Sequence, residues 1–421
     1  MRLGTLFLTI SGYPALARDI FNAWFGRLVK PIALCLMLLA PSGGAGALDW
    51  PEIDFWAVGI AEPECRSSSP PFPKLCEIRH LSQADLDEIT NELFAAASNG
   101  EYLSTLSDGI LTISSLSAER ESFVCCDIQG PFRAHENSDG QPISVARFGV
   151  PAGAFIHIEL MNDVDMIGSG YILESISDYQ KAYIGSQESQ IDVDYQTIRF
   201  DSLDRDVHVF QNRPDLPPKH IFYVKDGNNA PHVFAPALLE YYGGTLSEMP
   251  SFALIGIESG SSDVRLNEYV RAMSNDTAAY DRYRSIFEDA IVPQIEEMLG
   301  YTGGAAGRVL FGQSNGGRWV LDYSLDHPSF ACSIMAMSIA GGNLEQSEVA
   351  EASSATDCRN YYLAAGQLEG SMLARTEDMH HMLLAAGLSS QLVIEAGGHN
   401  FSSWVPAFLF FFDQIMTSAS D

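Results

Sequence analysis

The sequence predicts an α/β protein whose main part is a doubly wound, mostly parallel sheet, preceded by a smaller mixed α+β unit. From about residue 195, apolar strand-like segments alternate with amphipathic helical segments, as in sheets covered by helices on both faces. One repeat of this pattern is complete. It comprises a strand at 308–311, a glycine-rich turn at 312–316, a helix at 317–328 ended by Pro328, and a strand at 330–338. A strand, helix and strand in this order form a right-handed crossover between parallel strands.

The other elements of this part follow the same alternation. Residues 195–200 and 205–211 are expected to form a two-stranded hairpin ahead of the parallel strands. Further strands are expected at 220–227, 251–259, 361–366 and 391–396, and helices at 233–243, 280–298, 371–386 and the C-terminus. The helix at 280–298 carries its apolar residues on one face, and Pro293 predicts a kink within it.

The segment before this alternation is expected to fold as a separate unit. It opens with proline-rich sequence and continues with a helix at 82–97, which Ser82 is expected to cap over Asp85. Strand-like runs follow at 144–150, 154–161 and 170–176, and a polar stretch at 185–194 leads into the second unit. The predicted organisation is therefore a leader at 1–47, an N-terminal domain at 48–190 and a main domain at 191–421.

The first 47 residues have the features of a secretory signal peptide. Basic residues precede an apolar run at 31–40, and Ala45-Gly46-Ala47 provides an A-x-A cleavage site. The alternative is an uncleaved anchor, but the apolar run is about half as long as a membrane span requires. We therefore expect a periplasmic or secreted protein that has no stable membrane insertion once the leader is removed.

The chain is strongly acidic. It contains 24 Lys and Arg against 54 Asp and Glu, and without the leader 20 basic and 53 acidic residues remain, a net charge of about −33. Such a surface repels nucleic acids and anionic lipid headgroups, which excludes both as expected partners. We attribute the charge to solubility and not to a specific cationic partner.

The turn at 312–316, Gly-Gln-Ser-Asn-Gly, has the G-x-S-x-G spacing of a nucleophile elbow. In that turn a serine between strand and helix is raised above the sheet, and both glycines are needed because backbone packs against backbone. Glycine and serine also occur in ordinary loops. The flanking strand and helix favour the elbow, so Ser314 is the candidate nucleophile.

A serine hydroxyl needs a base to remove its proton, usually a histidine oriented by a carboxylate. His399 follows the strand at 391–396 within a glycine-containing loop, and Glu369 lies on the loop after the strand at 361–366. The order Ser314, Glu369, His399 is the order that this architecture uses. Other acidic residues near Glu369 in the sequence are Asp357, Glu377 and Asp378, of which the first precedes its strand and the others fall within a helix.

The oxyanion formed during acyl transfer needs hydrogen-bond donors. One donor is expected to be the backbone N–H of Asn315, the residue after the candidate nucleophile. The second is expected from the turn after the strand at 220–227, from the backbone of Gly227 or Asn228.

Six cysteines remain after removal of the leader, an even number that suggests disulfides in an oxidising compartment. Cys332 begins the strand after the elbow, and Cys358 lies just before the next strand. Neighbouring parallel strands place both residues at one edge of the sheet. We therefore predict a Cys332–Cys358 disulfide.

The other four cysteines are less informative. Cys65 and Cys76 could close a local loop across a proline-rich segment, whereas the adjacent Cys125 and Cys126 are left unassigned. No C-x-x-C or His-x-x-x-His spacing indicates a metal site. No metal or cofactor is expected.

Residues 220–415 resemble the esterase family of the α/β-hydrolases that includes enterochelin esterases, S-formylglutathione hydrolases and feruloyl esterases. The matching segments, in order, are 223–227 (YVKDG), 265–269 (RLNEY), 290–300 (AIVPQIEEMLG), 312–317 (GQSNGG), 366–370 (GQLEG) and 397–404 (GGHNFSSW). This resemblance implies an α/β-hydrolase fold and an esterase with Ser314 as nucleophile, Glu369 as acid and His399 as base. The resemblance does not reach residues 48–190.

The resemblance also concerns residues around the triad. It places Arg265, Tyr269 and Trp404 near the substrate, although Arg265 and Tyr269 could equally brace a loop. Asn315 stands where many relatives carry a different residue.

The expected function is that of an exported serine esterase acting on a small-molecule ester through an acyl-enzyme, the substrate being a siderophore ester or an aromatic acyl ester. Two alternatives remain open. The same site could transfer its acyl group to an alcohol, or the protein could be a polymer- or partner-binding module with a vestigial hydrolase domain.

Overall fold

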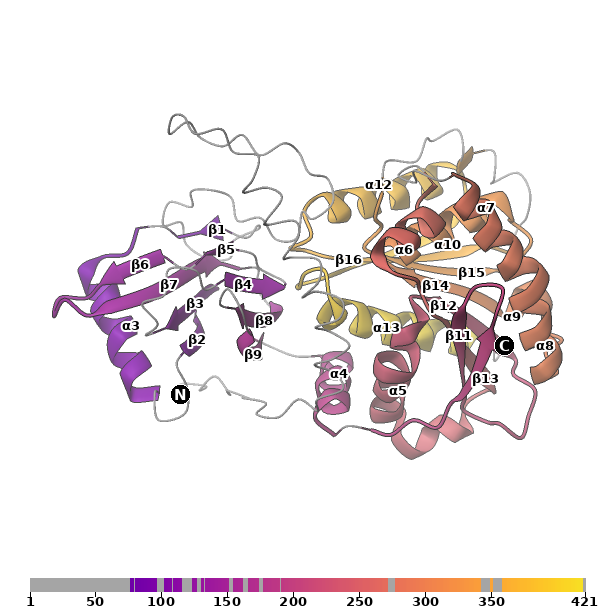
Figure 1. Cartoon of the computed structure of the whole chain (residues 1–421), viewed down its shortest axis with the longest axis horizontal. Coiled ribbons are helices and arrows are strands. Elements are labelled where there is room, and N and C mark those ends of the chain that lie inside the picture. The colour runs from indigo at the N-terminus through magenta and orange to yellow at the C-terminus, as the bar shows by residue number, and fades with distance from the viewer. Residues whose placement is uncertain are drawn as a thin grey trace.

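The computed structural model describes residues 76–418 except for short gaps, the longest of which are 116–122, 342–348 and 351–357. The expected leader, its cleavage site and Cys65 lie outside the described residues. Figure 1 shows an N-terminal lobe built from β1 to β9 and a larger C-terminal lobe. Among the described residues, no helix combines the length and apolar character that crossing a bilayer requires.

The N-terminal lobe contains two antiparallel sheets and one helix. Its elements are β1 (Cys76–Glu77), α3 (Gln83–Ala96), β2 (Tyr102–Ser107), β3 (Ile110–Ser115), β4 (Phe123–Cys126), β5 (Gly130–Pro131), β6 (Arg133–Glu136), β7 (Pro142–Gly149), β8 (Phe155–Met161) and β9 (Met166–Leu173). One sheet has the order β1-β7-β3-β2 with β6 beside β7, and the other has the order β5-β4-β8-β9. The Ser82 cap is confirmed, because its Oγ accepts the Asp85 N–H while the Asp85 carboxylate accepts the Ser82 N–H.

The C-terminal lobe is organised around an eight-stranded sheet. Its strands are β10 (Gln196–Phe200), β11 (Arg205–Gln211), β12 (His220–Lys225), β13 (Phe252–Ile257), β14 (Arg308–Gln313), β15 (Ser333–Met337), β16 (Asn360–Gly366) and β17 (Ser389–Glu395). Their order is β10-β11-β13-β12-β14-β15-β16-β17. Strands β10 and β11 form the antiparallel hairpin, and β11 pairs antiparallel with β13. In the spatial order given, every pair from β13–β12 to β16–β17 is parallel, as the sequence predicted.

Helices cover both faces of this sheet (Figure 1). They are α4 (Asp178–Ser189), α5 (Ala235–Tyr242), α6 (Ser262–Tyr269), α7 (Thr277–Ile286), α8 (Val292–Leu299), α10 (Asn315–Asp326), α12 (Ser371–Ala385) and α13 (Phe401–Ser418). Alternate residues of β12 enter different cores: Ile221 and Tyr223 face the core that includes α7 and α10, whereas Phe222 and Val224 face the core of α5 and α13. Burial on both faces explains why the strands are continuous apolar runs.

The long helix expected at 280–298 is interrupted one turn earlier than Pro293 suggested. A π-helical turn, Phe287–Ile291, separates α7 from α8, and Pro293 lies within the first two positions of α8. A proline lacks the N–H for the bond to the fourth preceding residue, and its ring crowds that carbonyl. The wider turn accommodates this missing bond, so the irregularity lies ahead of the proline.

Helix α4 lies before the sequence boundary at residue 190 but packs on the C-terminal lobe. Its Ala182, Tyr183 and Ile184 are buried in the same core as α5 and α13. The hydroxyl of Tyr179 donates to Asp413 on α13 at 2.8 Å. We propose that the main domain begins ahead of α4, near residue 177.

The predicted Cys332–Cys358 disulfide is present, with 5.1 Å between the two Cα atoms. Strands β15 and β16 align Ser333 with Asn360, which brings the preceding segments together at the amino-terminal edge of the sheet. Cys76 is also disulfide-bonded. Its pairing with Cys65 stays a prediction.

Replacing both Cys332 and Cys358 by serine is expected to lower the free energy of unfolding by about 3.5 kcal/mol, because the bridge restricts the unfolded chain. Urea denaturation followed by circular dichroism measures this difference. An unchanged unfolding midpoint in the double variant would contradict a stabilising bridge.

Candidate active site

Ser314 occupies a strained turn between β14 and α10. Its φ is +55° and its ψ is −124°, a conformation that non-glycine residues rarely adopt. The turn is tight, since a Cβ on Gly312 would lie 2.3 Å from the carbonyl carbon of Gly316. The Ser314 N–H donates to Met337 O on the neighbouring strand at 2.8 Å. Gly312, the first glycine of the sequence motif, is therefore required by backbone contact.

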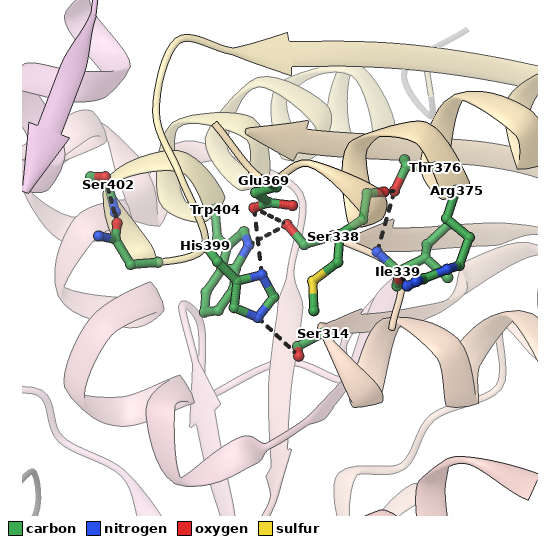
Figure 2. Close-up of polar contacts among 11 residues, drawn as sticks. Ser314, Ser338, Ile339, Glu369, Arg375, Thr376, His399, Ser402 and Trp404 are labelled. Carbon is green, nitrogen blue, oxygen red and sulfur yellow. Dashed lines mark hydrogen bonds and ion pairs between the residues drawn. The ribbon is translucent and has the colours of Figure 1, made fainter. Parts of the chain in front are cut away.

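His399 reaches this serine from the loop between β17 and α13. Its Nε2 lies 3.1 Å from Ser314 Oγ, within hydrogen-bond distance, although 85 residues separate the two in the chain (Figure 2). The imidazole side chain is only 9% exposed. Asn400 shapes the end of the loop, because its Oδ1 accepts the Ser402 N–H at 2.7 Å at the start of α13.

Glu369 lies behind the imidazole, on the loop after β16, and is fully buried. Its Oε1 is 3.6 Å from His399 Nδ1, and Figure 2 shows the carboxylate on the opposite side of the ring from Ser314. Glu369 Oε2 and His399 Nδ1 have no other hydrogen-bond partner among the described residues. The oxygen nearer to the imidazole is Oε1, and catalytic contacts of this kind are often long before a substrate binds.

The other acidic candidates are placed differently. Glu377 and Asp378 are exposed on α12, and Asp357 lies outside the described residues. Among the described residues, no group of three His, Cys, Asp or Glu side chains is arranged to hold a metal ion.

Ser338, which the sequence analysis did not single out, connects two residues of the site. Its Oγ donates to Glu369 Oε1 at 2.6 Å and accepts the Trp404 Nε1–H at 2.7 Å (Figure 2). The indole nitrogen is only a donor, so the proton of the hydroxyl is available for the carboxylate. Ser338 is fully buried and has a φ of +50°. The sequence signal for Ser338 was a polar residue at the carboxyl end of β15, which lies between the strands that lead to the candidate nucleophile and the candidate acid.

Trp404 therefore contacts both Ser338 and His399. Its exposure is 8%, and its ring packs edge-on against His399 with 4.9 Å between ring centroids. The resemblance placed this residue near the substrate, whereas its indole N–H is bonded to Ser338 and its ring is buried.

Replacing Ser338 by alanine is expected to lower kcat for p-nitrophenyl acetate by about 10- to 100-fold, since a hydrogen bond to a charged group contributes roughly 1.5–3 kcal/mol. Steady-state kinetics on the folded variant measure the loss. Ser324→Ala is the matched control, because this serine is also buried but donates to Leu321 O, away from the triad. Equal kcat values for Ser338→Ala and wild type would exclude a role for the hydroxyl.

Arg265 and Tyr269 brace the loop that follows β12. Arg265 Nε and Nη2 each donate to the Asp226 carboxylate at 2.5 Å, and this paired interaction is largely buried. Asp226 has a φ of +55°, so the ion pair holds an unfavourable backbone conformation. Tyr269 is fully buried beside it, with its hydroxyl 3.5 Å from the Asp226 N–H. Of the two roles left open, these contacts favour bracing.

The residue before this loop is a buried lysine that the sequence analysis did not identify. Lys225 is fully buried, with Nζ 3.5 Å from the ring centroid of Trp319 and 3.9 Å from that of Phe287. Its Nζ donates to the Tyr283 hydroxyl at 3.1 Å. Burial lowers the pKa of Lys225 well below its usual value, whereas the ring faces attract the charged form. The side chain fixes the end of β12 onto α7 and α10.

The two loops that carry the expected oxyanion donors are adjacent. A Cβ on Gly316 would lie 2.9 Å from Lys225 Cβ and 3.1 Å from Asp226 Oδ2, so the start of α10 packs on the end of β12. Asn315 is the first residue of α10, and Gly227 the first of a short 3-10 turn, Gly227–Asn229. First-turn N–H groups have no partner within their own helix. The N–H groups of Asn315 and of Gly227 or Asn228 remain the candidate donors.

Glu395 ends β17 just before the histidine loop, and burial raises its pKa to about 7 from 4.5. The folded protein keeps this proton between about pH 4.5 and 7 while the unfolded chain loses it, so stability falls as pH rises through that window. Glu395→Gln is expected to stabilise the protein by up to about 3 kcal/mol at pH 8 and by little at pH 4. Urea unfolding at both pH values tests this, with exposed Glu377→Gln as control. An equal effect of Glu395→Gln at both pH values would contradict the assignment.

The fold is similar to that of solved esterases. The enterobactin esterase of Shigella flexneri, solved in the presence of enterobactin, superimposes with a TM-score of 0.59 and 12% identity over 77% of this chain and 98% of that chain. The ferric enterobactin esterase of Salmonella typhimurium gives 0.56 and 11% over 77% and 99%. No family model and no curated protein matches the sequence.

This similarity confirms the α/β-hydrolase fold expected from the resemblance. It also extends further along the chain than the resemblance did. Residues 191–421 make up little more than half of the chain, so a match over 77% includes part of the N-terminal lobe.

Proposed function

We propose that the protein is a serine esterase that hydrolyses carboxylic esters through an acyl-enzyme intermediate on Ser314. The observation that carries this proposal is the 3.1 Å contact between His399 Nε2 and the Oγ of a serine held in a strained elbow. The buried Glu369 carboxylate behind the imidazole completes the arrangement of nucleophile, base and orienting acid.

The geometry supports a two-step reaction. Ser314 Oγ attacks the ester carbonyl carbon while His399 Nε2 takes the hydroxyl proton, and Glu369 stabilises the resulting imidazolium. The oxyanion is stabilised by the N–H of Asn315 and that of Gly227 or Asn228. Imidazolium then protonates the leaving alcohol. Water attacks the acyl-enzyme with His399 as base, which releases the carboxylic acid and restores the serine.

Siderophore esters are the substrate class that we propose to test first. The fold matches two enterobactin esterases over nearly their whole length, including part of the N-terminal lobe. Aromatic acyl esters, the other class expected from the sequence, form the second arm of the test.

We also propose that the protein acts in the periplasm or outside the cell. The sequence of residues 1–47 supports export, and the Cys332–Cys358 disulfide is consistent with an oxidising compartment.

The proposal is tested with the protein that begins at residue 48, assayed against p-nitrophenyl acetate, phenolic acyl esters and enterobactin. We expect turnover with a pre-steady-state burst of alcohol equal to the enzyme concentration, and no burst from Ser314→Ala. An added alcohol acceptor separates hydrolysis from acyl transfer, because transfer would give a new ester in place of the free acid. A wild-type protein without turnover on any ester would contradict the proposal and leave the binding-module alternative.

A further inference from the structure

The N-terminal lobe contacts the loop that carries the catalytic histidine candidate. Phe155, the first residue of β8, donates its N–H to Ala396 O at 2.9 Å. Ala396 lies between the end of β17 and the glycines that precede His399. This backbone bond joins chain segments more than two hundred residues apart and links the two lobes at the site.

Glycine allows the contact to be close on both sides of the loop. A Cβ on Gly397 would lie 2.9 Å from Phe155 O, and one on Gly366 would lie 2.5 Å from Gly397 O. On the side away from Phe155, the Leu368 N–H donates to Gly397 O at 2.9 Å. The loop is therefore held between β8 and the segment that carries Glu369.

The side chain of Phe155 anchors β8 in the C-terminal lobe. It is 1% exposed and belongs to the hydrophobic core that contains Trp404 and Val405 of α13. Its ring meets Tyr183 of α4 edge-on, with 6.2 Å between centroids. The same core supports Trp404, against which the His399 ring packs.

From these contacts we propose that the N-terminal lobe positions His399, with Phe155 as the positioning residue; this inference rests on the proposed esterase function. A loop containing two consecutive glycines has many accessible conformations and needs external contacts to hold one of them. Small displacements of a catalytic group reduce rates strongly. The lobe thus has a role for every ester, including substrates too small to reach it.

The test uses Phe155→Ala in the full mature protein with p-nitrophenyl acetate. Active sites are first counted with a fluorophosphonate, so that kcat refers to functional sites and loss of folded protein is removed. We expect kcat per site to fall about tenfold, with KM changed by less than about twofold, because the substrate is small and the defect lies in the base. The rate constant for fluorophosphonate labelling should fall in parallel.

Phe252→Ala is the matched control. This phenylalanine is equally buried in the same core but lies at the amino-terminal end of β13, whereas the His399 loop follows the carboxyl end of β17. It should lose stability and keep wild-type kcat per site. If Phe155→Ala does not fold, Phe155→Leu is measured in the same assay, and its kcat per site should also fall below that of wild type.

Wild-type kcat per site in the Phe155 variants would overturn the inference. An increase in KM for large esters, with kcat unchanged, would also overturn the inference, because the lobe would then act in substrate binding alone. Failure of the proposed function is distinguishable, since the wild-type protein itself would then show neither burst nor labelling.

Discussion

Replacing His399 by alanine is expected to lower kcat for p-nitrophenyl acetate by about 10⁴-fold or more, because Ser314 then has no group to take its proton. His399 Nε2 is the only ring nitrogen that the structure places within hydrogen-bond distance of Ser314 Oγ among the described residues. KM should change little, since the imidazole acts mainly in the transition state. Steady-state kinetics at neutral pH measure both constants.

His380→Ala is the matched control for this prediction. His380 lies on α12 with its Nδ1 2.9 Å from Ser390 Oγ, at the amino-terminal end of β17, whereas His399 follows the carboxyl end of that strand. Its loss should leave kcat within about twofold of wild type. If the control lost activity while His399→Ala kept it, the assignment of the base would be wrong.

Replacing Gly227 by alanine is expected to remove most activity and to destabilise the fold. The added Cβ would lie 1.9 Å from Ile257 N and 2.0 Å from the carbonyl carbon of Gly256, both backbone atoms that cannot rotate away. The turn must therefore shift, which moves a candidate oxyanion donor and costs about 10²- to 10³-fold in kcat. Overpacking costs roughly 1–3 kcal/mol in addition.

The control for this change is Gly244→Ala. A Cβ there would meet no atom within 4 Å, and the residue lies in a short 3-10 turn, Gly243–Glu248. We expect wild-type kcat and stability from this variant. Thermal unfolding and kcat are measured on both variants. The comparison shows whether the losses come from adding a methyl group in general or from adding it at residue 227. Normal activity in Gly227→Ala would show that this turn supplies no donor.

The sequence was sufficient for features that depend on local chemistry. The strand, turn and helix around Ser314 follow from an apolar run, two spaced glycines and a helix ended by proline, all within about twenty residues. The position of Cys332 and Cys358 ahead of neighbouring strands was likewise enough to predict their disulfide.

Features that depend on distant segments required coordinates. Ser338 and Trp404 are 66 residues apart, and only the fold shows that an indole N–H and a carboxylate share one hydroxyl. Helix α4 was not predicted: its end belongs to the polar stretch at 185–194, which was interpreted as a connection, and its three consecutive buried residues lie just ahead of that stretch. The π-helical turn ahead of Pro293 has no distinct composition and follows from packing around the proline.

The most direct test of the central claim is to map the residue that a fluorophosphonate modifies. The reagent should form one P–O bond to Ser314 Oγ per chain with loss of fluoride, and mass spectrometry of the peptides should locate a single adduct there. Labelling should be absent in Ser314→Ala and strongly slowed in His399→Ala. An adduct on another residue, or equal labelling of Ser314→Ala and wild type, would contradict the account.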